Sequence, residues 1–205
     1  MLDLPPPVPA IEFSLATRGM SKGIAQTDGP QVLARGELAF GHLVVGAYAK
    51  NVTSTSADGE GGLSIGWRGS AAGFDLAASA AWKRAIDPVA GSDTDALEIS
   101  SSITRRVGRF APKASVVWSP DDVGATGRTI FAEAGLGYRL TKYALVSAAL
   151  GRRERTGGAD YTAWNAGLAW NPDKHFTLDA RYYDTDGGAA QPYRARMVLA
   201  ARLKL

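Results

Sequence analysis

The sequence predicts an all-β fold, a transmembrane antiparallel up-and-down β-barrel of twelve strands with short periplasmic turns and longer extracellular loops. Segments of roughly ten residues in which apolar and polar side chains alternate recur along the whole chain. The links between these segments are alternately long and short. The last segment, residues 192–205, has one apolar face and one cationic face. Alternation with a period of two indicates strands, and its recurrence with unequal links is typical of a membrane-spanning barrel.

Composition narrows the class of protein. The 205 residues contain no linker, so we expect one domain, 1–205, with a proline-rich periplasmic lead at residues 1–9. No run approaches the roughly 20 apolar residues of a transmembrane helix. A net charge of +3 without a basic cluster argues against nucleic-acid binding, and the lack of cysteine excludes disulfides and thiolate chemistry. Because no leader segment precedes the first strand, we expect a mature form in which Met1 replaces a signal peptide.

The first half of the chain contains six predicted strands, at residues 11–18, 32–40, 43–52, 63–67, 74–83 and 97–106. One parity of these segments is apolar, and the faces of 43–52 stay unassigned. The apolar parity consists of Ile11, Phe13, Leu15, Val32, Leu38, Phe40, Leu63, Ile65, Trp67, Phe74, Leu76, Ala78, Ala80, Trp82, Leu97, Ile99 and Ile103. Short turns are expected at 41–42, 69–70 and around Gly108, and longer loops at 19–29, 53–59 and 84–95.

The second half contains six more predicted strands, at residues 110–118, 130–139, 143–151, 164–170, 176–182 and 192–205. Both faces of 143–151 are apolar, so its orientation also stays open. The apolar parity of the others includes Phe110, Val116, Trp118, Ile130, Leu136, Tyr138, Trp164, Leu168, Trp170, Phe176, Leu178, Tyr182, Met197, Leu199, Leu203 and Leu205. Long loops at 119–127, 152–159 and 184–191 complete six hairpins, which leave both chain ends on the short-turn side. Ten and fourteen strands are the nearest alternative counts.

Three features indicate that the apolar faces contact lipid. Aromatic residues lie near both ends of these faces, as they do at the two interfaces of a bilayer. The apolar faces are also rich in alanine, which would not fill the interior of a soluble barrel. Charged residues occupy the middle of the opposite faces, where water can hydrate them. The long-loop ring is formed by Trp82, Trp118, Trp164 and Tyr193, and the short-turn ring by Phe40, Trp67, Phe74, Phe110, Tyr138, Trp170 and Phe176.

Charged residues on the polar faces are the candidates for lining a pore. They are Arg35, Glu37, Asp75, Lys83, Glu98, Arg106, Lys113, Glu133, Arg139, Asp179, Arg181, Arg194, Arg196 and Arg202. Basic residues are in excess, so we expect a porin or channel for small solutes or ions that leans towards anions. The alternative is a closed structural or surface-binding barrel whose lumen is plugged by paired charges. Expected partners are outer-membrane lipid, lipopolysaccharide, small solutes or ions and the barrel-assembly machinery.

Catalysis is not expected. General-base chemistry in a barrel enzyme needs a histidine near the outer rim, but His42 and His175 lie beside short turns. Aspartates at 93 and 95 and at 121 and 122 are expected to be solvated loop residues instead of a metal site. No cofactor is expected.

The first loop carries a family resemblance. Arg18, Gly19 and Ser21, followed by Gln26, Thr27 and Asp28, resemble the R-G-x-S-q-t-D segment of TorF-type proteobacterial porins, and the likeness extends over about residues 11 to 90. Residues 22–25 lengthen the spacing of that motif. The resemblance implies an outer-membrane barrel with porin activity. We further hypothesise that Arg18 and Asp28 pair and fold this loop inwards.

Overall fold

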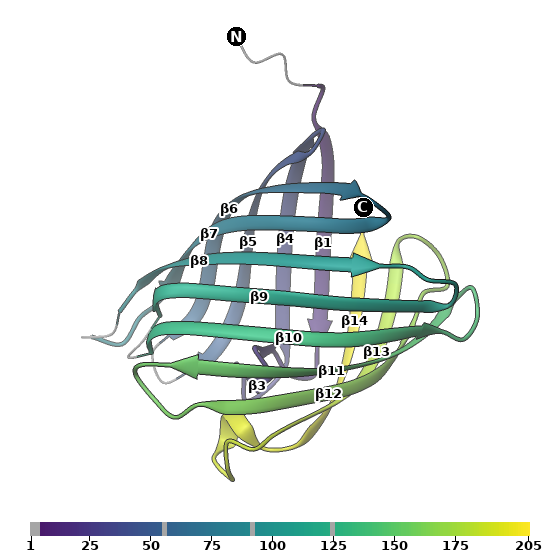
Figure 1. The fold of residues 1–205 in the computed structure, drawn as a ribbon. Helices are drawn as coiled ribbons and strands as arrows, with labels where there is room; N and C mark the ends of the chain where they lie inside the picture. Colours follow the sequence, from purple (N-terminus) through teal and green to yellow (C-terminus); the bar gives the residue numbers. More distant parts are fainter. Residues whose placement is uncertain (1–4, 55–56, 91–92, 124–125) are drawn as a thin grey trace.

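A computed structural model describes residues 5–54, 57–90, 93–123 and 126–205 of the chain. Within these residues twelve antiparallel strands form a closed barrel, which confirms the predicted fold class (Figure 1). The remaining residues of the proline-rich lead and of three predicted loops, 1–4, 55–56, 91–92 and 124–125, lie outside this description. No helix formed by the described residues is long and apolar enough to cross a membrane.

The barrel strands follow one another round the wall in chain order. They are β1 (Val8–Ala16), β4 (Gln31–Phe40), β5 (Leu43–Ser54), β6 (Ala57–Ala71), β7 (Phe74–Ile86), β8 (Asp95–Arg105), β9 (Phe110–Asp122), β10 (Gly127–Arg139), β11 (Ala144–Arg155), β12 (Tyr161–Trp170), β13 (Phe176–Thr185) and β14 (Arg196–Lys204). A separate two-stranded hairpin, β2 (Met20–Ser21) and β3 (Ile24–Ala25), lies in the first loop, and a short 3-10 helix, η1 (Gln191–Tyr193), lies in the last.

The barrel closes where the first strand meets the last. The backbone N–H of Ile11 donates to the carbonyl of Leu205 at 3.2 Å, and the N–H of Leu205 donates back at 2.9 Å. This pairing confirms that the C-terminal strand closes on the first one (Figure 1). The predicted start of that strand at residue 192 is wrong, because Pro192 lies in η1 and β14 begins at Arg196.

The apolar parity faces outwards. Met197 is 60% exposed and Leu63 is 58% exposed, whereas Val198, the neighbour of Met197 on the other parity, is buried. The structure determines which face of the strands at 43–52 and 143–151 points outwards. Val44 and Val52 of β5 are buried, and Leu150 of β11 is exposed. A barrel with such an exterior is stable only where lipid covers it, so the structure is a transmembrane barrel.

The short turns hold strongly bent backbone. Ala72 and Gly73 join β6 to β7 with φ angles of 52° and 78°, and two consecutive positive φ angles are typical of a tight type I′ hairpin. The predicted turn at 69–70 is therefore wrong, because both residues lie within β6. In the turn between β12 and β13, the Asp173 carboxylate accepts the backbone N–H groups of His175 and Phe176, which lowers the pKa of Asp173.

Several strands extend beyond their predicted ends at the long-loop side of the barrel. β6 has 15 residues and β9 has 13, whereas a tilted strand needs only about 9–11 to cross a bilayer. Residues Glu60, Asp122 and Arg153, which the sequence assigns to loops, consequently lie in strands. The extra length provides a rim of barrel wall to which the first and last loops attach.

Candidate pore and constriction

The first loop folds on itself through the motif residues. Arg18 Nη1 donates to the carbonyl of Thr27 at 3.0 Å and lies 3.6 Å from Asp28 Oδ1, so the hypothesised pair is present. The N–H of Gly19 donates to Thr27 Oγ1 at 2.8 Å, and this hydroxyl donates to the carbonyl of Gly29. Thr27 is 1% exposed. These bonds close the base of the loop and direct the β2–β3 hairpin towards the lumen.

The tip of the hairpin lies against β12. Gly23 has a φ of 83°, and a Cβ built on it would lie 2.2 Å from Cβ of Ala163. Only glycine can adopt this backbone conformation at such a close approach without strain. Tyr161, which is fully buried, donates its hydroxyl to the carbonyl of Lys22 at 2.7 Å. The hairpin therefore reaches across from β1 and β4 to the wall formed by β12.

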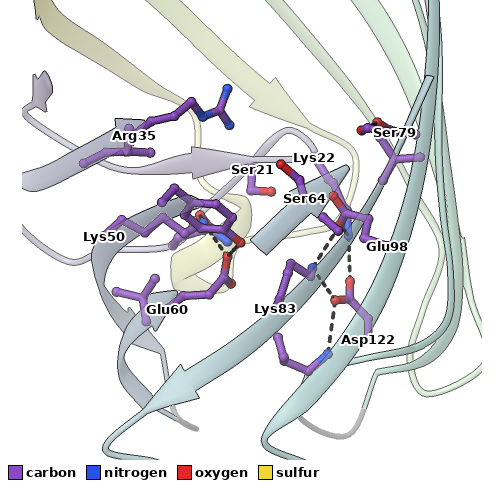
Figure 2. Close-up of a pocket in the computed structure, with 18 of the residues that line it drawn as sticks. Ser21, Lys22, Arg35, Lys50, Glu60, Ser64, Ser79, Lys83, Glu98 and Asp122 are labelled. Carbon is purple, nitrogen blue, oxygen red and sulfur yellow. Dashed lines mark hydrogen bonds and ion pairs between the residues drawn. The ribbon is translucent and has the colours of Figure 1, made fainter. Parts of the chain in front are cut away.

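A buried ionic cluster holds the same tip from another side. Lys22 Nζ lies 2.7 Å from Asp122 Oδ2 and 2.9 Å from Glu98 Oε2 (Figure 2). Lys83 Nζ contacts the same two carboxylates at 2.8 and 2.9 Å, and Arg153 Nη2 lies 3.1 Å from Asp122. Three cations thus share two carboxylates. Buried charges of this kind are stable only when they are paired, so the cluster fixes the hairpin to β7, β8 and β9.

A second group of polar contacts attaches the hairpin to β5. Lys50 Nζ donates to Gln26 Oε1 at 2.7 Å and lies 3.1 Å from Glu60 Oε1, which also accepts the hydroxyl of Tyr48 at 2.6 Å. The N–H of Thr53 donates to the carbonyl of Gln26 at 2.9 Å. Gln26 of the loop motif is therefore bonded through both its side chain and its backbone.

A cavity of about 1090 Å³ runs beside the hairpin. Its lining extends from Tyr193 in the last loop to Arg68 near the short turns. There it adjoins a second hollow of about 570 Å³, since Arg68, Ala77 and Ser102 line both. The two hollows therefore share part of their wall near the short-turn end of the barrel.

The cavity lining carries many charged side chains, with an excess of positive charge. Among the described residues it includes eight basic and six acidic side chains. Near the short turns Arg68 Nη2 lies 2.8 Å from Glu37 Oε1 and Arg35 Nη1 lies 4.0 Å from it, so one carboxylate faces two guanidinium groups. Lys113 has no ion pair within the part of the chain that the structure describes.

The predicted lumen residues fall into three groups. Those that line the main cavity are Arg35, Glu37, Lys83, Glu98 and Lys113. Asp75 lines the smaller hollow at the short-turn end, where it accepts the hydroxyl of Ser70. The other predicted residues lie away from both cavities, and their role in a pore stays a prediction.

That third group is largely engaged with its own surroundings. Arg181 contacts Asp179 at 3.2 Å and donates to Asn165 and Ser147 of neighbouring strands. Arg202 Nε lies 3.7 Å from Glu12. Glu133 is half-buried in β10, whereas Arg106 and Arg139 are exposed where β8 and β10 reach the short turns. Arg194 and Arg196 donate to loop carbonyls, and Arg194 lies in the last loop instead of on the predicted strand.

Four residues of these polar contacts lie outside the predicted strands. They are Lys22, Glu60, Asp122 and Arg153. Extending the alternation of β6 outwards would have assigned Glu60 to the lumen face, whereas Arg153 follows a strand whose two faces are both apolar. Asp122 offered no such signal, because three residues of β9 from Ser119 oppose two of β10 and the bulge reverses the parity.

Tyr193 does not lie in the environment that the sequence predicts for it. The sequence assigns it to the lipid-facing aromatic ring, but it lies in η1, with its ring centroid 5.4 Å from that of Tyr161. The guanidinium of Arg155 lies over both rings. Tyr193 consequently lines the outer end of the cavity and attaches the last loop to the rim.

The two histidines lie at the short turns, as predicted. Nδ1 of His42 is 2.7 Å from the carbonyl of Arg68, and Nδ1 of His175 is 2.8 Å from that of Lys204. Within the described residues, no three His, Cys, Asp or Glu side chains gather in a way that would hold a metal ion.

Comparisons with known proteins identify the fold. No family profile and no curated sequence matches the chain. Solved structures match over nearly its whole length: the KdgM porin in complex with disordered oligogalacturonate (TM-score 0.64, 8% identity, 95% of this chain and 97% of that one) and the NanC porin (0.61, 6%, 94% and 97%). The COG4313 outer membrane channel from Pseudomonas putida F1 also matches (0.53, 11%, 100% and 96%). The chain therefore has the fold of bacterial outer-membrane porins and channels.

Proposed function

We propose that this protein is a channel of the bacterial outer membrane that passes small hydrophilic solutes or ions. The cavity beside the hairpin supports this proposal, because it is lined by many charged and hydroxyl side chains, is large enough for a small solute and adjoins a second hollow at the short-turn end of the lumen. A barrel whose lumen served only for stability would fill this space with side chains. The wall instead carries small residues here, such as Ser79, Ser100 and Ser102.

The charges of the inner half of the cavity support a preference for anions. Arg35 and Arg68 are about half exposed, and Glu37 is the carboxylate paired with both. Lys113 adds a further positive charge to the same lining. In Figure 2 the guanidinium of Arg35 lies away from the ionic cluster of the hairpin. Because the sign of the lining charge selects the permeant ion, this arrangement favours anionic solutes.

We also propose a class of solute and a family for this protein. The KdgM porin, solved with oligogalacturonate, shares the fold and was bound to an acidic oligosaccharide, which agrees with a cationic pathway. The Arg18 to Asp28 segment further supports placing the chain with the TorF-type porins. Outer-membrane lipid and lipopolysaccharide would surround the apolar exterior, and the barrel-assembly machinery would insert it.

Single-channel conductance in a planar bilayer tests the proposal. Refolded protein in a KCl gradient is expected to give discrete current steps and a reversal potential of the sign that anion selectivity produces. A cation-selective reversal potential would refute the anion preference. Silence from protein whose folded state is shown by heat-modifiable electrophoretic mobility would refute the channel itself.

One observation favours a second candidate, a closed barrel with a structural or surface-binding role. The outer half of the lumen is occupied by the hairpin and its buried ion pairs, which resembles the paired plug of small structural barrels. The same bilayer recording distinguishes the two functions. A folded but silent barrel would support the closed form and direct attention to the acidic loops.

A further inference from the structure

We propose that the β2–β3 hairpin, residues 20–25, is the selectivity element of this barrel and sets the largest solute that can pass. This inference rests on the proposed channel function. It concerns a part of the lumen that the barrel strands do not form. A hairpin projecting from the first loop, instead of the strand walls, would determine the narrowest section.

The first line of evidence is the reach of the hairpin around the lumen. It lies between β1 and β4 in the chain, bonds to β8 and β9 through Lys22 and contacts β12 at Gly23, and Gln26, which follows it directly, bonds to β5. These strands lie on different sides of the closed barrel. A segment held from several directions projects into the lumen and is not a loop lying along one wall. Figure 2 shows one of these attachments, at Lys22, Glu98 and Asp122.

The second line of evidence is the composition of the wall beside it. Between the layer of Lys83 and Glu98 and the layer of Arg68 and Lys113, the lumen-facing positions of β6 to β8 are occupied by glycine, serine and alanine. They are Gly62, Ser64, Gly66, Ala77, Ser79, Ala81, Ser100 and Ser102. Such short side chains leave the β6 to β8 side of the lumen open, so this part of the wall does not form the narrowest section.

The third line of evidence is where the open space lies. Among the described residues, the cavity lining comes from β4 to β9, the hairpin and its loop, the outer end of β11, the long loops at Asp93 and at Val123 and Thr126, and η1, whereas none comes from β10, β12, β13 or β14. The hairpin therefore closes the β12 side, against which Gly23 is seated, and leaves a passage between itself and the wall of small residues. A solute crosses that passage or is excluded.

Shifting the hairpin into the passage should lower permeation, whereas removing the hairpin should raise it. Gly23→Ala adds a Cβ 2.2 Å from Cβ of Ala163, which pushes the hairpin away from β12 and into the passage. Its conductance is expected to fall. Gly29→Ala is the matched control in the same loop, since a Cβ there meets nothing within 4 Å. Replacing residues 20–25 by two glycines removes the hairpin and is expected to raise the conductance severalfold.

The experiment measures single-channel conductance and the size of polyethylene glycol that still enters the pore, for the wild type and these three variants. Heat-modifiable mobility verifies that each barrel is folded. Passage of larger polymers through the hairpin-deleted variant, with Gly29→Ala unchanged, supports the inference. An unchanged exclusion size after deletion overturns it and leaves the channel function intact. A silent wild type with a conducting deletion variant supports the hairpin as the barrier but refutes an open native channel, whereas two silent proteins refute both.

Discussion

Asp122 is the residue whose replacement tests the ionic cluster most directly. Its carboxylate, 5% exposed, accepts Lys22 at 2.7 Å, Lys83 at 2.8 Å and Arg153 at 3.1 Å. Asp122→Asn keeps the shape of the side chain and removes its charge. Among the described residues of the cluster, Glu98 then remains the one carboxylate, paired with Lys22 and Lys83, and Arg153 loses its ion pair.

The magnitude follows from those contacts. Each hydrogen bond to a charged group contributes about 1.5–3 kcal/mol, and the amide oxygen of asparagine retains part of this. Breaking a buried ion pair by removing one partner costs about 3–5 kcal/mol, because the other charge is left uncompensated. We therefore expect the free energy of unfolding to fall by about 3–5 kcal/mol in Asp122→Asn.

Urea-induced unfolding in phospholipid vesicles, followed by tryptophan fluorescence, measures this change. The matched control is Asp121→Asn, because Asp121 is the exposed neighbour on the same bulge. The control is expected to stay within about 0.5 kcal/mol of the wild type, as exposed substitutions usually do. A loss of less than about 1 kcal/mol in Asp122→Asn would show that lumen water, and not the carboxylate, compensates the three cations.

Two further substitutions address selectivity and packing. Lys113→Gln is expected to lower the anion-to-cation permeability ratio by up to about fivefold, because one charge in water contributes about 1 kcal/mol. The control is Lys142→Gln, in a short turn. Its reversal potential is expected to stay at the wild-type value. Gly62→Ala places a Cβ 2.4 Å from the Tyr48 ring and should destabilise the barrel by about 1–3 kcal/mol in the same urea assay. Gly61→Ala, which meets only ordinary contacts, should not destabilise it, and equal losses in both variants would contradict the packing argument.

The strand pattern was predictable because it depends on a local physical rule. Lipid on one side and water on the other impose alternation on every strand, so Leu63 and Met197 reveal their face without any knowledge of their neighbours. Strand ends were less predictable. A strand that leaves the bilayer no longer needs an apolar outer face, and the alternation that marks Glu60 weakens there.

The contacts that hold the hairpin inside the lumen could not be predicted, because they join distant parts of the chain. Lys22 and Asp122 are 100 residues apart in the chain, and their contact depends on a bulge in β9 and on the closure of the whole barrel. The motif indicated that the loop folds, through Arg18 and Asp28. The motif also led to the hypothesis of an inward fold, but nothing local to residues 20–25 identifies the residues that hold them, since these partners lie on other strands.

The lumen contains charges that stabilise the barrel by pairing and charges that can attract solutes. The two kinds lie at different depths. The exterior gains little from packing in the manner of a soluble core, because lipid already surrounds those side chains in the membrane. Interior contacts must therefore hold the hairpin in place. In the outer half the three cations Lys22, Lys83 and Arg153 form ion pairs with Glu98 and Asp122. Charges neutralised in this way attract few solutes. In the inner half Arg35 and Arg68 share the carboxylate of Glu37, and Lys113 adds a further positive charge to the lining. Selection by size should accordingly occur at the hairpin and selection by charge below it, so substitutions in one layer should leave the other property unchanged.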